Sequence, residues 1–257
     1  MATHKALQMF GRSGNPTLND ATFTNEGIAT GQTMTLEGTV NKTGMLLALL
    51  VLSATYTWNL FFQDGNPAAV MPATIGGAIG GLVFALVTIF KKQWAGITAP
   101  IYALLQGLFL GGISAIFESQ YPGIVIQATG LTLGTLASLL LLYKLGIIKP
   151  TENFKLGVFA ATGGVALLYI ISFIMSFFGE GISLLSTQNS SIMSIGLSLA
   201  IIVIASLNLV IDFDFIEEGA EKGAPKYMEW YGAFGLLVTL IWLYLEILRM
   251  LAKFRNK

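Results

Sequence analysis

The chain has 257 residues, of which 54% are hydrophobic and only 11% are charged. An ordinary soluble domain has about 25% charged residues, so the composition excludes that class of protein. Its 14 basic and 14 acidic residues give no net charge, which argues against nucleic-acid binding, and the absence of cysteine excludes disulfides and thiolate metal sites. With a mean hydropathy of +0.72, the chain is predicted to form one membrane-embedded domain.

Residues 1–42 are polar and rich in Gly, Thr and Asn, and we expect them to form a mostly irregular tail. Gly14, Asn15 and Pro16 are turn-forming residues within it. The tail has no continuous apolar core, so we do not expect a cleaved signal peptide. Residues 43–257 are expected to form the transmembrane domain.

Seven apolar stretches in this domain are long enough to cross a membrane. A hydrocarbon core of roughly 30 Å needs about 20 residues in helical form. The alternation of a membrane barrel is absent, and helices satisfy every backbone hydrogen bond inside a bilayer. We therefore predict an all-α polytopic membrane protein with seven transmembrane helices. The predicted spans are Gly44–Phe62, Val70–Phe90, Gly96–Phe117, Gly123–Tyr143, Leu156–Phe178, Ile192–Ile211 and Trp230–Leu251.

Basic residues are distributed unequally between alternate connectors. The connectors at 63–69, 118–122 and 179–191 contain no Lys or Arg. Ten basic residues would lie on the other side of the membrane: Lys5, Arg12, Lys42, Lys91, Lys92, Lys144, Lys149, Lys155, Lys222 and Lys226. Because short cytoplasmic loops carry an excess of basic residues, the N-terminus is predicted to be cytoplasmic.

The C-terminal basic residues fit this orientation less well. Seven complete spans would put Lys253, Arg255 and Lys257 on the outer side. Either this end of the chain is translocated, or the last hydrophobic segment does not cross completely.

Two spans contain glycines four residues apart, which predict close packing between helices of the same chain. These glycines are Gly76, Gly77, Gly80 and Gly81 in the second span, and Gly107 and Gly111 in the third.

Half of the fourteen acidic residues lie between Leu207 and Lys253. They are Asp212, Asp214, Glu217, Glu218, Glu221, Glu229 and Glu246. An ionised group at the centre of a bilayer costs at least ~2.5–3.5 kcal/mol, so acids within or beside a span are candidates for function.

Asp212 follows twenty apolar residues and is expected at the inner boundary of span six. Asn208 precedes it by four residues and therefore shares its face of the helix. Asp214 points to the opposite side if the helix continues, so the two aspartates do not face one partner. Both are candidate gating or ion-sensing residues, and the alternative for each is a solvated helix end.

Glu229 begins span seven at a depth that matches Asp212. We therefore consider that the two acids share a proton or a cation. Neighbouring carboxylates repel and are oxygen ligands for calcium. No calcium-loop spacing is present, so a metal site at Asp212 is only weakly indicated.

Two further polar positions lie inside spans. Glu246 is sixteen residues into span seven, and Arg249 follows it by three residues, so we expect a structural ion pair. Gln106 in span three is expected to form a hydrogen bond between helices.

The sequence offers little for an enzyme. The only histidine is His4, in the tail, and no serine-hydrolase, zinc-protease or phosphate-loop motif occurs. An aspartyl intramembrane protease would need a second acid paired with Asp212, which is missing. We predict no enzyme activity and no cofactor.

The run LNLVIDFDFIEEGAEKGAPKYMEWYGAFGLLVTLIWLYLEILRML, with YALLQGLFLGGIS in span three and RSGNPTL in the tail, resembles the bacterial, YccA-like (TMBIM-type) branch of the Bax inhibitor family. The resemblance covers essentially the whole chain. It implies a bacterial inner-membrane protein in which six helices surround a central C-terminal helix. It also implies a pH-sensitive calcium leak, controlled by two aspartates on spans six and seven and by a basic residue after span two.

Asp212 matches the span-six aspartate of the family, and Lys91 or Lys92 fits the basic position, where an arginine is usual. The position of the second aspartate falls near Thr239, which has no charge, and Gln106 stands where relatives often carry Glu. Glu229 and Asp214 are the candidates to replace the missing acid.

Two hypotheses therefore remain. The first is a pH-sensitive leak channel for calcium or other cations gated at Asp212. The second is a non-conducting regulator that binds other membrane proteins, such as a protease or a secretion complex.

Overall fold

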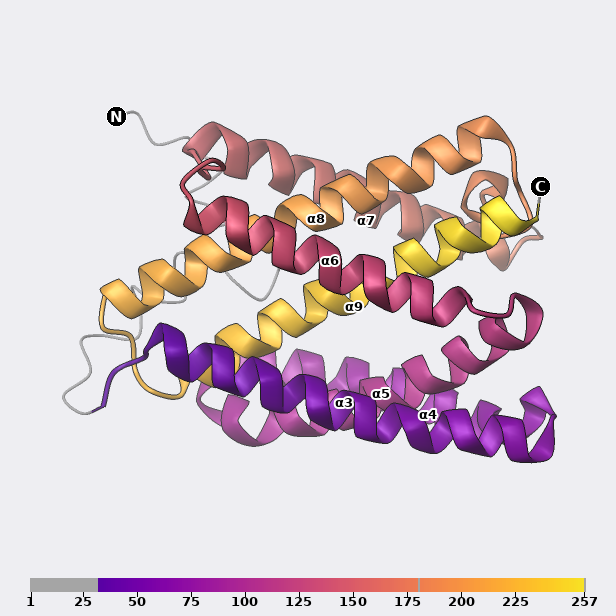
Figure 1. Cartoon of the computed structure of the whole chain (residues 1–257), viewed down its shortest axis with the longest axis horizontal. Coiled ribbons are helices and arrows are strands. Elements are labelled where there is room, and N and C mark those ends of the chain that lie inside the picture. The colour runs from indigo at the N-terminus through magenta and orange to yellow at the C-terminus, as the bar shows by residue number, and fades with distance from the viewer. Residues whose placement is uncertain (1–31, 180, 257) are drawn as a thin grey trace. The chain divides into compact units, whose positions relative to one another are not determined.

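The structure, a computed structural model, describes residues 32–179 and 181–256. Within these residues seven helices are long and apolar enough to cross a membrane (Figure 1). They are α3 (Leu36–Asp64), α4 (Pro67–Phe90), α5 (Ala95–Gln120), α6 (Ile124–Lys144), α7 (Glu152–Ser176), α8 (Ile192–Glu221) and α9 (Met228–Arg255). The connectors contain two short 3-10 turns, η1 (Lys92–Trp94) and η2 (Ser183–Leu185). The predicted all-α class with seven spans is confirmed.

Two helix boundaries differ clearly from the predicted spans. α3 begins at Leu36, because the Thr35 hydroxyl accepts a hydrogen bond from the Gly38 backbone N–H at 3.0 Å and caps the helix. The last seven residues of the predicted tail are therefore helical. α8 continues ten residues beyond Ile211, so Asp212 and Asp214 lie inside a helix and not at its end.

Several residues named from the sequence lie outside the described part of the chain. They are His4, Lys5, Arg12, Gly14, Asn15, Pro16 and Lys257.

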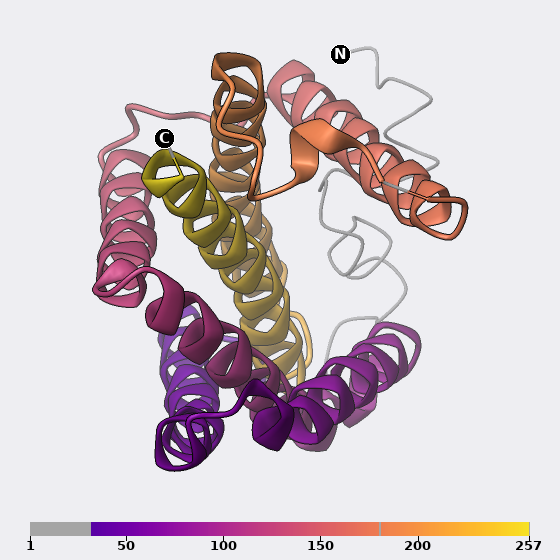
Figure 2. The same cartoon turned by 90° about the vertical axis from the view of Figure 1, so that its right-hand side faces the viewer.

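The chain divides into two compact units. The α3–α5 unit contains α3, α4 and α5, together with residues 216–237 from the end of α8 and the start of α9. The α6–α8 unit contains α6 from Ile126 onward, α7, α8 as far as Phe215, and the rest of α9. α8 and α9 are each unbroken helices, as Figure 2 shows for α9 in yellow, and each contributes residues to both units.

Glycines bring helix backbones close together in the α3–α5 unit. A Cβ atom added to Gly107 or Gly111 of α5 would overlap backbone carbonyl oxygens of α3. One added to Gly77 of α4 would lie 2.5 Å from the carbonyl oxygen of Leu105 in α5. These contacts confirm the predicted close packing at Gly77, Gly107 and Gly111, whereas Gly76 has open surroundings, so the prediction is wrong there.

The α6–α8 unit lacks such glycine contacts on α7 and buries several ionisable side chains. A Cβ atom on Gly163 or Gly164 of α7 would meet nothing within 4 Å, so these glycines do not mark a close approach. The buried ionisable residues of this unit are Lys155, Asp212, Glu246 and Lys253.

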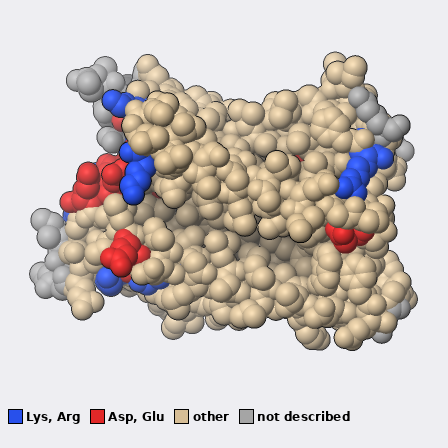
Figure 3. Space-filling model, in the orientation of Figure 1, with Lys and Arg blue, Asp and Glu red and all other residues tan. Residues whose placement is uncertain are grey.

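The outer sides of the helices are apolar. Charged side chains occupy only small parts of the face drawn in Figure 3, as lipid contact requires. α9 buries 61% of its most apolar window, a larger share than any other helix of the described chain.

Candidate functional site

Asp212 and Asn208 of α8 form two hydrogen-bonded pairs, one with α9 and one with α7, on successive turns of α8 in the α6–α8 unit. The Asp212 side chain is fully buried, and its Oδ2 accepts a hydrogen bond from the Thr239 hydroxyl of α9 at 2.6 Å. Asn208, one turn earlier on α8, is 1% exposed and donates from Nδ2 to the Thr162 hydroxyl of α7 at 2.8 Å. We call these four residues the Asp212 cluster, and its side-chain oxygens come from α7, α8 and α9.

The amide oxygen of Asn208 has no hydrogen-bond donor within the described chain. Nδ2 uses its second hydrogen on the Ile204 carbonyl oxygen, at 2.9 Å. If the Asn208 amide were flipped, its oxygen would face the Ile204 carbonyl oxygen, and two acceptors would lie against each other. The contact with Ile204 therefore identifies which atom of the amide is the oxygen. Oδ1 is therefore a buried acceptor beside Asp212 on the same helix face.

Asp214 points away from this cluster. Its carboxylate forms an ion pair with Lys155 of α7, whose side chain is 6% exposed. Asp212 contacts α9 and Asp214 contacts α7, which confirms that the two aspartates do not face one partner. Asp214 and Asp212 thus have different partners in this structure, and a role for Asp214 as the second acid stays a prediction.

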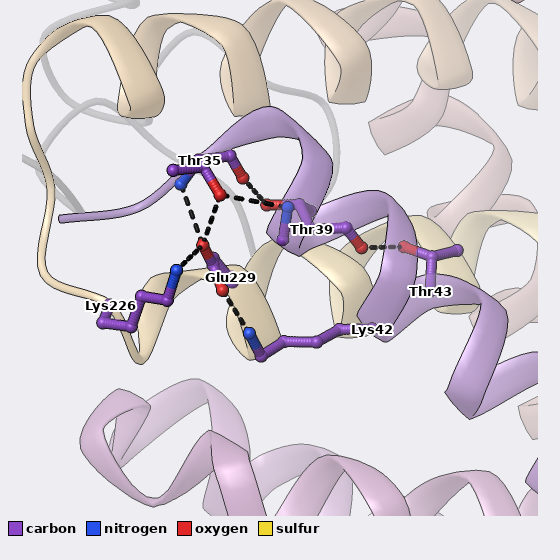
Figure 4. A network of polar contacts seen from close by, with 7 residues as sticks. Thr35, Thr39, Lys42, Thr43, Lys226 and Glu229 are labelled. Carbon is purple, nitrogen blue, oxygen red and sulfur yellow. Dashed lines mark hydrogen bonds and ion pairs between the residues drawn. The ribbon is translucent and has the colours of Figure 1, made fainter. Parts of the chain in front are cut away.

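Glu229 forms a second network, in the α3–α5 unit, where it connects the starts of α3 and α9 (Figure 4). Its Oε1 accepts hydrogen bonds from the Thr35 backbone N–H at 2.9 Å and from the Thr35 hydroxyl at 2.8 Å. Lys226 approaches the same oxygen at 2.8 Å, and Lys42 forms an ion pair with Oε2. A Cβ on Gly38 would overlap this carboxylate, so a larger residue there would displace Glu229 from this position.

Glu229 and Asp212 thus belong to different units, and each has partners of its own. The proposed sharing of a proton or a cation between these two acids stays a prediction. The position of Glu229 in the first turn of α9 also suits a carboxylate, because helix N-termini favour negative charge.

Glu246 and Arg249 form the ion pair expected from their spacing. Arg249 Nη1 lies 3.1 Å from each carboxylate oxygen of Glu246, which is 2% exposed. The Tyr169 hydroxyl of α7 donates to Glu246 Oε1 at 2.6 Å and accepts from Arg249 Nη1 at 2.5 Å. The pair is therefore a three-residue network between α7 and α9.

The remaining predicted residues lie in the α3–α5 unit. Lys91 follows the last residue of α4 as its C-cap and is exposed. The Lys92 ammonium lies 5.9 Å from the centre of the Tyr231 ring. Gln106 packs its amide against Gly81, and within the described chain it forms no hydrogen bond, so the expected interhelical bond is absent.

Sequence reasoning missed the residues that complete these networks. Lys155, Thr162 and Tyr169 of α7 are spaced by seven residues and so lie on one helix face, which was a readable signal. Thr35, as an N-cap before an acidic first turn, was also readable. No group of three or more His, Cys, Asp or Glu side chains within the described chain is placed to hold a metal ion.

These features define a multi-pass helical membrane protein with buried ionisable groups in its last three helices. The family model described as Bax inhibitor 1 like matches residues 15–256. The chain therefore belongs to the Bax inhibitor 1 like family. Comparisons with curated proteins and with solved structures gave no match.

Proposed function

We propose that this protein is a membrane leak channel for calcium or related cations, and that protonation of Asp212 controls its opening. The observation that carries the proposal is the buried contact between Asp212 and Thr239. The resemblance puts the second aspartate of the family near Thr239. Helices α8 and α9 thus meet at the expected place, with a hydroxyl in place of the second carboxylate.

Protonation acts on this contact by changing its strength. A hydrogen bond to an ionised carboxylate is roughly twice as strong as one between neutral groups. Loss of the Asp212 charge therefore weakens the tie between α8 and α9. The proposed gating step is the weakening of this hydrogen bond between α8 and α9 when Asp212 is protonated.

The oxygens of the Asp212 cluster suit a passing cation. Calcium takes carboxylate and amide oxygens as ligands. Asp212 supplies the first, and Asn208 Oδ1, which no donor in the described chain satisfies, supplies the second. The cluster holds a single carboxylate, so it fits a weak transit site better than a tight binding site.

We also propose a bacterial cytoplasmic membrane location with a cytoplasmic N-terminus, as in the YccA-like branch. α9 has 28 residues and no break, which makes it about 42 Å long at 1.5 Å per residue. This length supports a complete seventh span and a translocated C-terminus. It argues against a last segment that turns back within the membrane.

The first test is calcium entry into liposomes that contain the purified protein and a trapped calcium dye. Wild-type liposomes are expected to take up calcium faster than protein-free liposomes, at a rate that changes with pH. Asp212→Asn, which cannot change its charge, is expected to lose that change. Wild-type liposomes no leakier than protein-free ones would overturn the proposal.

The second candidate, a non-conducting regulator, is favoured by the uncharged Thr239. It predicts no flux from pure protein and a stoichiometric membrane-protein partner after mild detergent extraction. Robust flux without such a partner would exclude it.

A further inference from the structure

Lys253, in the last turn of α9, is a fully buried lysine whose partners are uncharged. Its ammonium donates to the Leu184 carbonyl oxygen at 2.8 Å, the Ser198 hydroxyl at 2.9 Å and the Ser194 carbonyl oxygen at 3.3 Å. Its three donors thus have three acceptors, and no ion pair joins it to another described residue. Burying a charge without an opposite charge is costly, so this position is not explained by packing alone.

The acceptors form a preorganised oxygen cup. Leu184 lies in η2, in the connector between α7 and α8, and Ser194 and Ser198 lie in the first two turns of α8. The Ser194 hydroxyl donates to the Leu184 carbonyl oxygen at 2.8 Å and so holds that oxygen in place. Both serines are buried, at 0% and 2% exposure. Backbone carbonyls and hydroxyls gathered in this way are the ligands that membrane proteins use for alkali-metal ions.

The oxygen cup and the Asp212 cluster lie along the same pair of helices. α9 advances fourteen residues from Thr239 to Lys253, and α8 runs back fourteen residues from Asp212 to Ser198. The two contacts therefore belong to one antiparallel pairing with a constant register. They are about 21 Å apart along the helix axes at 1.5 Å per residue.

One face of each helix carries the polar groups of this pairing. Thr239, Glu246 and Lys253 follow one another at seven residues, or about two turns, along α9. Fourteen residues on α8 are close to four turns, so Ser198 and Asp212 also share a face. A cation that moves along this pairing from the Asp212 cluster would next meet Glu246 and then the oxygen cup.

We propose that the oxygen cup is a binding site for a monovalent cation, and that the Lys253 ammonium occupies it as a tethered ion and blocks passage there. The blocking role rests on the proposed leak function, whereas the binding site does not. Lys253 closes the end of α9 that lies farther from Asp212. Removal of its charge leaves three oxygens able to bind a sodium ion.

The test compares Lys253→Met, which removes the charge and ends one atom short of the lysine ammonium, with Lys253→Arg, which keeps the charge. Arg255→Met is the matched control, because Arg255 is a basic residue of the same helix end but exposed, with a hydrogen bond to Gln127 at 3.1 Å. Sodium and calcium flux into liposomes is expected to rise by about tenfold or more in Lys253→Met, since a unit charge within ~4 Å strongly affects a permeating cation. Lys253→Arg and Arg255→Met are expected to stay near wild type.

A second readout does not require conduction. The melting temperature of each variant in detergent is measured in sodium chloride and in choline chloride. Lys253→Met is expected to be stabilised by sodium, and wild type is not. A purely structural lysine would lower the melting temperature equally in both salts.

The outcomes separate the site from the channel. Sodium-dependent stabilisation of Lys253→Met without any flux would support the cation site and overturn the leak function. Wild-type calcium flux with unchanged flux and no sodium effect in Lys253→Met would overturn only the role of Lys253. If Lys253→Met does not fold, Ser198→Ala removes one acceptor and keeps the lysine. It should raise flux by a smaller factor, and wild-type flux from Ser198→Ala would then overturn the inference.

Discussion

The two units of this protein hold their helices together by different means. In the α3–α5 unit, glycines such as Gly107 and Gly111 let helix backbones touch. In the α6–α8 unit, the glycines of α7 have open surroundings, and helices meet through buried polar groups such as Asp212 and Lys253. Contact between helix backbones holds the helices in one arrangement. A buried carboxylate changes its hydrogen bonds when it is protonated, and a buried ammonium changes them when it is displaced. Under the proposed gating function, the α3–α5 unit is the fixed support and the α6–α8 unit is the part that responds to pH.

Glu229 shows that a buried acid can also serve the fixed part. Its carboxylate is held by Lys42, Lys226 and Thr35, so its charge is matched by two cations. Asn208 Oδ1, in the other unit, has no donor in the described chain. A fully paired acid stabilises one arrangement, and an incompletely satisfied polar cluster leaves room for a proton or an ion.

The largest expected effect comes from filling a glycine contact. Gly111→Val should destabilise the protein by more than about 3 kcal/mol, because its side chain would overlap the backbone of α3. Melting temperature and monodispersity in detergent report the change. Gly163→Ala, in open surroundings on α7, is the control and should alter stability by about 1 kcal/mol or less. Equal losses of stability in the two variants would show that glycine packing does not distinguish the two units.

Breaking the ion pair in α9 should come next. Arg249→Met leaves Glu246 buried without its cation and should cost about 3 kcal/mol. The double variant Glu246→Gln with Arg249→Met should recover part of that loss, because neither charge remains. Chemical or thermal unfolding of the single and double variants measures it. A double variant less stable than Arg249→Met would show that the Glu246 charge is held by other groups.

The Glu229 network should contribute less per group. Glu229→Gln weakens its ion pairs to Lys42 and Lys226 and should cost roughly 2 kcal/mol. Glu218→Gln is the control, because its pair with Lys222 is an i,i+4 surface contact that should be worth about 0.5 kcal/mol or less. The same melting measurement applies, and similar losses would mean that the buried network adds no stability.

Asn208→Leu should have the smallest effect on stability, about 1 kcal/mol or less. The change removes two hydrogen bonds made by Nδ2, and it also removes the buried oxygen that has no donor. The melting temperature should therefore change little while calcium flux falls. A large loss of stability with normal flux would assign Asn208 a structural role only.

The seven spans could be predicted because a run of about 20 apolar residues has the length that a helix needs to cross a bilayer. The end of span six was misplaced because Asp212 looks like a boundary when its environment is unknown. In the structure α8 passes through Asp212 to Glu221, and the Thr239 hydroxyl of α9 donates to the Asp212 carboxylate. An acid inside an apolar run can thus mark a partner on another helix as well as a helix end.

The candidate site was only partly predictable. Asp212 and the pair of Glu246 with Arg249 were found from composition and local spacing. Lys253 was read as a charge at the end of the chain, because its acceptors lie 55 to 69 residues away in the sequence. Contacts at such separations depend on how helices pair, and neither periodicity nor charge distribution contains that pairing.

The most direct test of the account compares Asp212→Asn with Asp214→Asn in calcium-loaded flux measurements over a series of pH values. The two aspartates are two residues apart on one helix, but Asp212 contacts Thr239 and Asp214 pairs with Lys155. We predict a pH-independent calcium flux for Asp212→Asn and a pH dependence like that of wild type for Asp214→Asn. A wild-type pH dependence in Asp212→Asn would contradict the assignment of gating to Asp212.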